Sequence, residues 1–384
     1  MGASRHLAVI GDGATAAAFL AATDARQGDQ LTIIGPWVGR LGAGRVYADH
    51  GSGDAWRFGY LLDRPNAAMG RGFAGWLAGQ WPELRQEIVA YQPRHLARWH
   101  AALSAGDFDA FAAPRALYGR FLSEQSRTRL ADLAETGVAI RLVPGIASDI
   151  AREGEMFRIT LSTGEAIRAD RVDVATGGPA NQRFGSDAGP TAFTTLHGNE
   201  RAIAEVLTPG QEVTCLGASP DVLDVLHFLR SVRPDDEMAL RVIRGEKAPY
   251  LEADPDYRAL KDAGRIVEEP GHVDWVYAEA PGQVRVRFRR ADGERVERTV
   301  PVAINTAGAG EHLAVDLLIS GLIAKGWLRL DEGRKGLVVR ADLSAEMDGL
   351  RYLSSAVRRV GDTPLDGEPT GTAAMARLIR AGAV

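Results

Sequence analysis

Cysteine is nearly absent from this chain of 384 residues, which contains only Cys215. A single thiol forms no intramolecular disulfide and no C-x-x-C pair, so dithiol relay chemistry is excluded. Long apolar runs are also missing, because no stretch of eighteen apolar residues occurs, and this excludes a helical membrane span. The first apolar run begins almost at the N-terminus, which leaves no room for a cleavable signal and predicts a cytoplasmic protein.

Strong charge and the motifs of several enzyme classes are lacking as well. The net charge is −5, and the one dense arginine stretch, residues 287–298, alternates with apolar residues as a solvated hairpin would. Nucleic acid is therefore not an expected partner. There is no G-x-S-x-G elbow and no P-loop, which argues against hydrolases and NTPases. His95 and His100 are five residues apart and would splay on a helix, so we expect structural histidines and no metal site.

A glycine-rich turn near the N-terminus is the first motif that carries chemistry. The apolar run 6–10 is followed by Gly11-Asp12-Gly13-Ala14-Thr15-Ala16, then by an alanine-rich helix expected over residues 17–25, and then by the apolar run 31–34. This is a βαβ unit whose turn fits G-x-G-x-x-A. Gly11 permits the turn, Gly13 lets a pyrophosphate approach, and Ala16 keeps the helix close to the strand. The helix N-terminus, with Ala14 and Thr15, would face the phosphates. The alternative is a plain tight turn.

The expected ribose-binding acid is missing from this unit. An Asp or Glu about twenty residues after the glycines usually holds the ribose 2′-hydroxyl. Here the second strand ends in Gly35-Pro36. Either backbone groups and water bind that hydroxyl, or other residues bind the adenosine end. Arg40 is a candidate for a contact with a phosphate.

Further motifs and elements follow this unit in the chain. Gly42, Gly44 and Tyr47 form a second glycine-rich turn, which is close enough in sequence to close over the same ligand. The aromatic stretch 52–82 either walls an active site or caps a core. A helix is expected from Pro114 to Glu135, followed by a strand, a hairpin about residues 163–164, and a buried strand that ends in Ala175-Thr176-Gly177.

In this order the motifs resemble the two-dinucleotide flavoproteins typified by glutathione reductase. More closely, the chain resembles the bacterial FAD-NAD(P)-binding protein family related to N-hydroxylating and Baeyer–Villiger monooxygenases. The residues that carry the closer match are Gly42, Gly44 and Tyr47 ("GrGxaY"), Met69, Phe73, Trp76 and Leu77 ("M…F..WL"), and Pro114-Arg115 with 118–122 ("PR..YGrYL"). Gly35, Gly59 and Ser354 depart from the family pattern at the expected flavin site.

A second strand, turn and helix unit lies at residues 211–230. Its turn contains Gly217, but Ser219 replaces the second glycine, so a pyrophosphate would approach less closely. The next strand ends in Arg244, a cation of the kind that meets the 2′-phosphate of NADP. The alternative is a half-domain kept only for packing.

The resemblance implies two three-layer, Rossmann-like dinucleotide-binding domains, the second inserted in the first. We expect a FAD-binding domain at residues 1–190 and 300–384 and an NAD(P)H-binding-like domain at residues 191–299. The strand 302–305 would return the chain to the FAD domain. A last helix, which begins at Thr372 and Ala373, would aim its N-terminus at the flavin ring.

The expected function is a FAD-dependent oxidoreductase, and more specifically an NAD(P)H-using monooxygenase acting on a small organic substrate. The argument for oxygen chemistry is partly negative, because no cysteine pair exists to take electrons from the flavin. Catalytic residues are not assigned, no membrane partner is expected, and a homodimer is left open. The alternatives are a nucleotide-binding partner subunit without turnover and a flavin-free NADP-dependent dehydrogenase.

Overall fold

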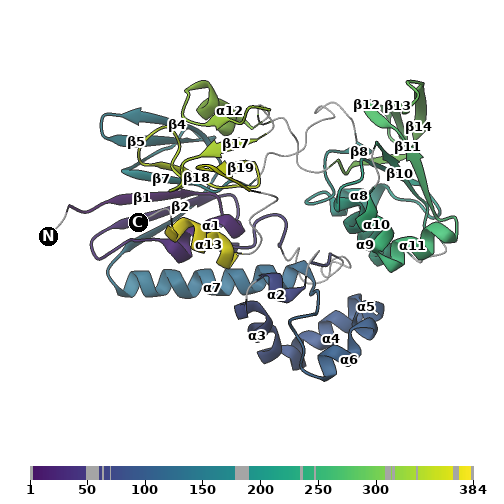
Figure 1. Cartoon of the computed structure of the whole chain (residues 1–384), viewed down its shortest axis with the longest axis horizontal. Coiled ribbons are helices and arrows are strands. Elements are labelled where there is room, and N and C mark those ends of the chain that lie inside the picture. The colour runs from purple at the N-terminus through teal and green to yellow at the C-terminus, as the bar shows by residue number, and fades with distance from the viewer. Residues whose placement is uncertain are drawn as a thin grey trace.

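The computed structural model describes residues 3–48, 60–62, 65–69, 71–177, 190–233, 237–245, 248–307, 313, 316–333, 336–365 and 372–381. Two α/β lobes lie side by side, with a group of short helices below them (Figure 1). We call the lobe that contains the N-terminal strand the first unit and the other lobe the second unit. Among the described helices, none is long and apolar enough to cross a membrane.

The first unit is built on a five-stranded parallel sheet in the order β18-β7-β1-β2-β3. Its strands are β1 (His6–Ile10), β2 (Gln30–Gly35), β3 (Ala139–Pro144), β7 (Arg171–Val174) and β18 (Leu350–Tyr352). Both faces are covered, which explains why β1 and β2 are almost continuously apolar. Helix α1 (Ala14–Ala22) links them and completes the predicted βαβ unit. It ends earlier than expected, because the backbone of Thr23 is extended.

Two layers cover this sheet (Figure 1). Helices α7 (Arg115–Glu135) and α13 (Thr372–Ala381) pack against α1 on one face. The antiparallel strands β4 (Ala147–Glu153), β5 (Met156–Leu161) and β6 (Ala166–Ala169) cover the other. Beside them lie helix α12 (Leu317–Ala324) and a small sheet of β16 (Arg329–Leu330), β17 (Leu337–Val339), β19 (Val357–Val360) and β20 (Thr363–Pro364).

The second unit repeats this arrangement. Its parallel sheet has the order β11-β10-β9-β15-β8, so that β9 lies between β10 and β15 as β1 lies between β2 and β7. The strands are β8 (Ala192–Phe193), β9 (Val213–Leu216), β10 (Leu240–Arg244), β11 (Ile266–Pro270) and β15 (Val302–Asn305). The helices are α8 (Glu200–Val206), α9 (Asp221–Val232), α10 (Pro249–Ala253) and α11 (Pro255–Asp262), and an antiparallel sheet is formed by β12 (His272–Ala280), β13 (Gln283–Arg289) and β14 (Arg295–Val300). The predicted fold class, two three-layer dinucleotide-binding domains, is confirmed.

The assignment of residues 302–305 to the first domain is wrong. Strand β15 pairs with β9 and β8 of the second sheet. The reason is the strand-to-glycine pattern that the two units share. A Cβ on Gly217 would lie 2.5 Å from Cα of Ala307, just as a Cβ on Gly11 would lie 2.2 Å from the carbonyl oxygen of Ala175. The pattern therefore marks the neighbour of the first strand in each unit, and the chain leaves the second sheet only after Asn305. The division at residues 190 and 191 stays a prediction.

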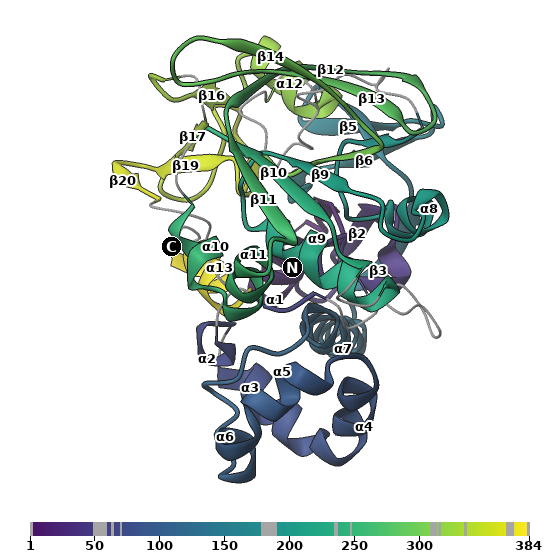
Figure 2. The same ribbon diagram turned by 90° about the vertical axis from the view of Figure 1, so that its right-hand side faces the viewer.

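The short helices lie between β2 and α7 in sequence and below both units in space (Figures 1 and 2). They are α2 (Asn66–Met69), α3 (Arg71–Gly79), α4 (Trp81–Tyr91), α5 (Pro93–Arg98) and α6 (His100–Ser104), preceded by the short 3₁₀-helix η1 (Val38–Arg40). Phe73 is fully buried, and its ring packs edge-on against Tyr118 of α7 with the centroids 5.1 Å apart. The described aromatic residues of this stretch thus form a separate small core. Residues 52–59, including Gly59, lie outside the described part of the chain.

Candidate dinucleotide-binding site

The turn between β1 and α1 has the shape that a pyrophosphate needs. Gly11 has a positive φ of +125°, which an L side chain rarely adopts, and its N–H donates to the carbonyl oxygen of Ile34 at 2.7 Å. Gly13 has no such constraint. A Cβ added there would meet only Cα of Gly44, at an ordinary 3.7 Å. Packing within the protein therefore does not require a glycine at position 13, and the space beside it suits a ligand.

The first turn of α1 carries no negatively charged side chain. No side chain caps the start of the helix either. The first N–H groups of a helix have no acceptor within the helix, and the helix dipole favours an anion there. Ala14, Thr15 and Ala16 contribute these groups, and Ala16 is fully buried, as close packing requires. This end of α1 therefore fits a pyrophosphate.

Helix α13 begins beside the start of α1. Thr15 Oγ1 donates to the sulfur of Met375 at 3.7 Å, and Met375 lies in the first turn of α13. The helix starts at Thr372, as expected. The side chains of Thr372 and Ala373 lie outside the described part of the chain, so their contact with a flavin stays a prediction.

The second glycine-rich turn lies directly against the first. Gly42 has a φ of +100°, and its N–H donates to the carbonyl oxygen of Asp12 at 2.7 Å. A Cβ on Gly44 would lie only 2.9 Å from Cα of Gly13. The expectation that the two turns come together is thus met, although a shared ligand remains a proposal. Tyr47 follows and packs edge-on against the ring of Tyr118.

The end of β7 completes the same region. Ala175 donates its N–H to the carbonyl oxygen of Ile10 at 2.7 Å, and Gly177 has a φ of +80°. Thr176 lies between them. The first unit thus brings residues 11–16, 42–44, 175–177 and the start of α13 to the carboxyl end of β1. Ser354, where a glycine was expected, is buried, and its hydroxyl lies 2.8 Å from that of Tyr352.

The corresponding turn of the second unit is closed by its own hydrogen bonds. Ser219 donates its N–H to the carbonyl oxygen of Thr306 at 2.9 Å. Its hydroxyl and its carbonyl oxygen accept the N–H groups of Asp221 and Val222, at 3.2 and 3.0 Å. Pro220 has no N–H to offer. The groups that would face a phosphate at the start of α9 are therefore already satisfied within the protein.

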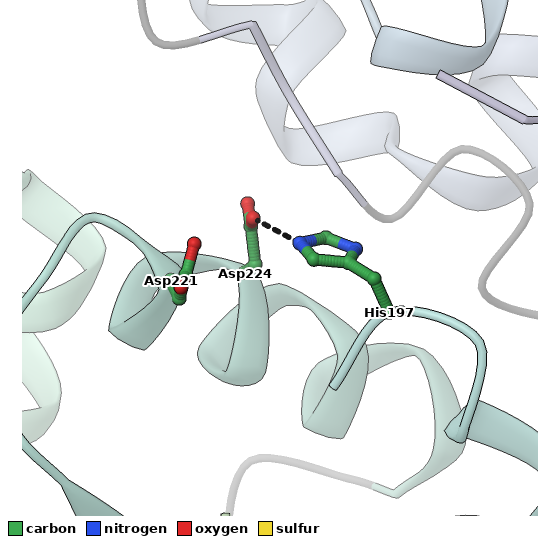
Figure 3. A group of neighbouring side chains, drawn as sticks. All are labelled: His197, Asp221 and Asp224. Atoms are coloured by element: carbon green, nitrogen blue, oxygen red, sulfur yellow. Dashed lines mark hydrogen bonds and ion pairs between the residues drawn. The ribbon is translucent and has the colours of Figure 1, made fainter. Parts of the chain in front are cut away.

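Two carboxylates also lie in the first turn of α9, Asp221 and Asp224. They point to the same side of the helix, and a hydrogen bond joins Asp224 to His197 (Figure 3). Burial raises the pKa of Asp221. Burial also pushes the pKa of Asp224 upward, but the guanidinium of Arg115, 2.6 Å away, and the bond from His197 outweigh it and hold that pKa below its usual value. This cluster was not predicted from the sequence, because Arg115 is remote from Asp224 in the chain.

Neither a metal nor a phosphate is favoured by this cluster. The ligand atoms of His197, Asp221 and Asp224 lie within 4.8 Å of one another, but Arg115 already supplies a cation to Asp224. An incoming pyrophosphate would meet the carboxyl groups of Asp221 and Asp224 in the first turn of the helix. The start of α9 is therefore unlike the start of α1, although the two helices occupy equivalent places in the fold.

The remaining predicted residues lie as follows. Arg244 ends β10 and forms an ion pair with Glu268 at 2.8 Å, so its contact with a 2′-phosphate stays a prediction. Cys215 is fully buried in β9, and burial raises the pKa of its thiol to about 12. His95 is held by the carbonyl oxygen of Ala112, and burial lowers its pKa to about 4, as expected of a structural histidine.

Comparison with known proteins agrees with this geometry. Residues 8–179 match the family model described as FAD-NAD(P)-binding. A search of curated proteins found no match. Among solved structures, the chain is similar to the Staphylococcus aureus bacillithiol disulfide reductase (TM-score 0.59, 12% identity, 99% of this chain and 98% of that one). It is also similar to the ornithine N-hydroxylase of Kutzneria sp. 744 (TM-score 0.57, 14% identity, 99% of this chain and 97% of that one). A third similar structure is the Lactococcus lactis thioredoxin reductase (TM-score 0.56, 11% identity, 99% of this chain and 98% of that one).

At these identities the structural likeness shows the fold alone. The family match covers the glycine turns and the end of β7, which are the segments that build the cradle described above. FAD and NAD(P)H are the cofactors that this match and the flavoprotein fold support. Residues 8–179 therefore match the FAD-NAD(P)-binding family model, within a chain that has the fold of two-domain flavoproteins.

Proposed function

We propose that this protein is a FAD-dependent monooxygenase that takes its electrons from NAD(P)H and acts on a small organic substrate. The observation that carries the proposal is the contrast between the two helix starts, because only α1 combines an uncapped N-terminus with an open glycine. There, the α1 N–H groups hold the FAD pyrophosphate beside Gly13. The dipole of α13 stabilises negative charge on the flavin ring. Bound FAD supplies the redox chemistry, accepting a hydride and passing electrons on.

Oxygen is the acceptor that the thiol content favours. The structural neighbours include both disulfide reductases and an N-hydroxylase, so the fold does not decide between them. A protein dithiol relay needs two cysteines, whereas this chain has one, buried and with a raised pKa. In the proposed reaction, one oxygen atom enters the substrate, the other leaves as water, and one NAD(P)H is oxidised.

The start of α9 favours a second candidate, a nucleotide-binding partner subunit without turnover. Asp221 and Asp224 lie where a coenzyme pyrophosphate would bind, so NAD(P)H must be held in another way or not at all in the second unit. A flavin-free dehydrogenase is less favoured, because the better phosphate cradle lies in the first unit. A cytoplasmic location and a homodimer remain predictions.

Purification and reconstitution test the flavin. The protein should be yellow, or become yellow with added FAD, and Gly13→Ala should lose FAD while keeping its denaturation midpoint, because the new Cβ fits the protein but fills the ligand space. Gly75→Ala, with nothing within 4 Å of its Cβ, is the matched control and should keep FAD. A colourless protein that takes up no FAD would overturn the proposal.

Coenzyme and oxygen measurements test the turnover. Anaerobic NADPH or NADH should bleach the flavin, and readmitted oxygen should yield either one hydroxylated product per coenzyme or hydrogen peroxide. A protein that binds FAD but is reduced by neither coenzyme would favour the partner subunit. One that is reduced but stays reduced in air would be a reductase.

A further inference from the structure

Asp12, between the two glycines of the first turn, is turned towards the carboxyl end of β2. Its side chain is buried, with 5% of the residue exposed. Its Oδ2 accepts the N–H of Trp37, just beyond β2, and its carbonyl oxygen accepts the N–H of Gly42. Both the backbone and the carboxylate of Asp12 are therefore fixed.

Gly35, the last residue of β2, is a glycine because of Asp12. Its φ is not positive, so its backbone would accept any residue. A Cβ added to Gly35 would instead lie 2.6 Å from Oδ2, 2.7 Å from Cγ and 2.8 Å from Cβ of Asp12. Side chains at the two positions exclude each other. The carboxylate of Asp12 thus occupies the space from which an acid at position 35 would project.

An acid at the end of the second strand holds a ribose hydroxyl in dinucleotide-binding units of this type. We propose that Asp12 supplies that carboxylate in this chain and accepts a hydrogen bond from the 2′-hydroxyl of the FAD adenosine ribose. The proposal rests on FAD binding in the first unit. The proposal explains two observations together. The end of β2 has no acid at Gly35, and the glycine turn has one at Asp12, so the turn supplies the carboxylate that the strand usually provides.

A swap of the two residues tests the proposal. Asp12→Gly should weaken FAD binding by about ten- to a hundredfold, the range for a hydrogen bond to a charged group. FMN has no adenosine, so its binding should not change. Gly35→Asp alone should displace the turn that contains Asp12, because the two side chains would overlap. The double variant Asp12→Gly/Gly35→Asp should recover most of the FAD affinity. Dissociation constants are measured by flavin fluorescence on the flavin-free protein.

An FAD analogue whose adenosine lacks the 2′-hydroxyl tests the same hydrogen bond on the unaltered protein. The unaltered protein should bind the analogue about ten- to a hundredfold more weakly than FAD, and Asp12→Gly should bind both equally. Equal binding of FAD and the analogue by the unaltered protein would overturn the assignment. So would an Asp12→Gly variant that loses FMN as much as FAD, because a purely structural role gives that result. Failure to bind FAD at all would instead overturn the proposed function.

Discussion

Arg115 and Asp224 form a buried ion pair between helix α7 of the first unit and helix α9 of the second. Nη1 of Arg115 lies 2.6 Å from Oδ2 of Asp224, and their side chains are 12% and 3% exposed. Replacement of Arg115 by Met would leave the carboxylate of Asp224 buried and without this cation. Removing one partner of a buried pair typically costs about 3 to 5 kcal/mol. We expect a loss in the free energy of unfolding of that size at pH 7.

A matched control lies on the same helix. Arg120 pairs with Glu87 at 3.1 Å, with side chains 23% and 39% exposed. Because solvent screens such a pair, Arg120→Met should cost about 1 kcal/mol or less. The double variant Arg115→Met/Asp224→Leu should recover much of the loss, since apolar residues often replace a buried pair at little cost. Guanidinium denaturation measures all four proteins. A loss in Arg115→Met no larger than in Arg120→Met would refute the reasoning.

The same pair predicts how the loss depends on pH. In the unaltered protein the pKa of Asp224 is lowered, so its contribution is present above the ordinary carboxyl pKa and is lost as the pH falls. Without Arg115, burial should raise that pKa, and the folded variant then gains stability as the pH falls. The difference between the two proteins should therefore narrow from pH 7 towards about pH 4. A difference that stays constant over this range would contradict the role of the Asp224 charge.

Other changes test packing, the thiol and the coenzyme. Gly119→Ala should cost roughly 2 kcal/mol or more in unfolding free energy, because its Cβ would lie 1.9 Å from the carbonyl oxygen of Tyr47. Gly75→Ala, which is exposed on α3, should instead raise the denaturation midpoint. Native Cys215 should resist iodoacetamide at pH 8, as read by mass spectrometry, because burial raises its pKa to about 12, and Cys215→Ala should keep turnover. The unaltered protein should prefer NADPH to NADH, and Arg244→Ala should reduce that preference by about ten- to a hundredfold. Equal rates of flavin reduction by NADPH and NADH in the unaltered protein would refute a contact of Arg244 with the 2′-phosphate.

Local sequence patterns were enough to predict many of the strands, turns and helices, and the family resemblance predicted their arrangement in two domains. The buried parallel strands are continuous apolar runs, and helix α7 was expected to end at Glu135, where the structure ends it. The glycine turns could be predicted because Gly11 and Gly217 meet steric demands that act within one βα connection. The error at residues 302–305 arose because two sheets of the same topology each need a strand that ends against the first glycine. A local pattern does not say which sheet it joins.

The candidate site was only partly predictable for a related reason. The missing acid at Gly35 was evident in the sequence, but its cause was not. Asp12 lies more than twenty residues earlier and comes close to Gly35 only when the βαβ unit is folded. The cluster around Asp224 was missed because Arg115 and His197 come from separate segments. Contacts between segments far apart in the chain carry no periodic signal.

Topology and ligand binding are set by different residues in the two units. Buried apolar side chains fix the strand order, and four strands have the same order in both sheets, β7-β1-β2-β3 and β15-β9-β10-β11. The first turn of the following helix decides what an anion meets, and there the units differ. Helix α1 begins with small uncharged residues, whereas α9 has Asp221 and Asp224 in its first turn. Because Arg115 of the first unit neutralises Asp224, these residues hold the two units together at the place where a second dinucleotide would be expected to bind. The duplicated fold therefore does not imply two equivalent nucleotide sites.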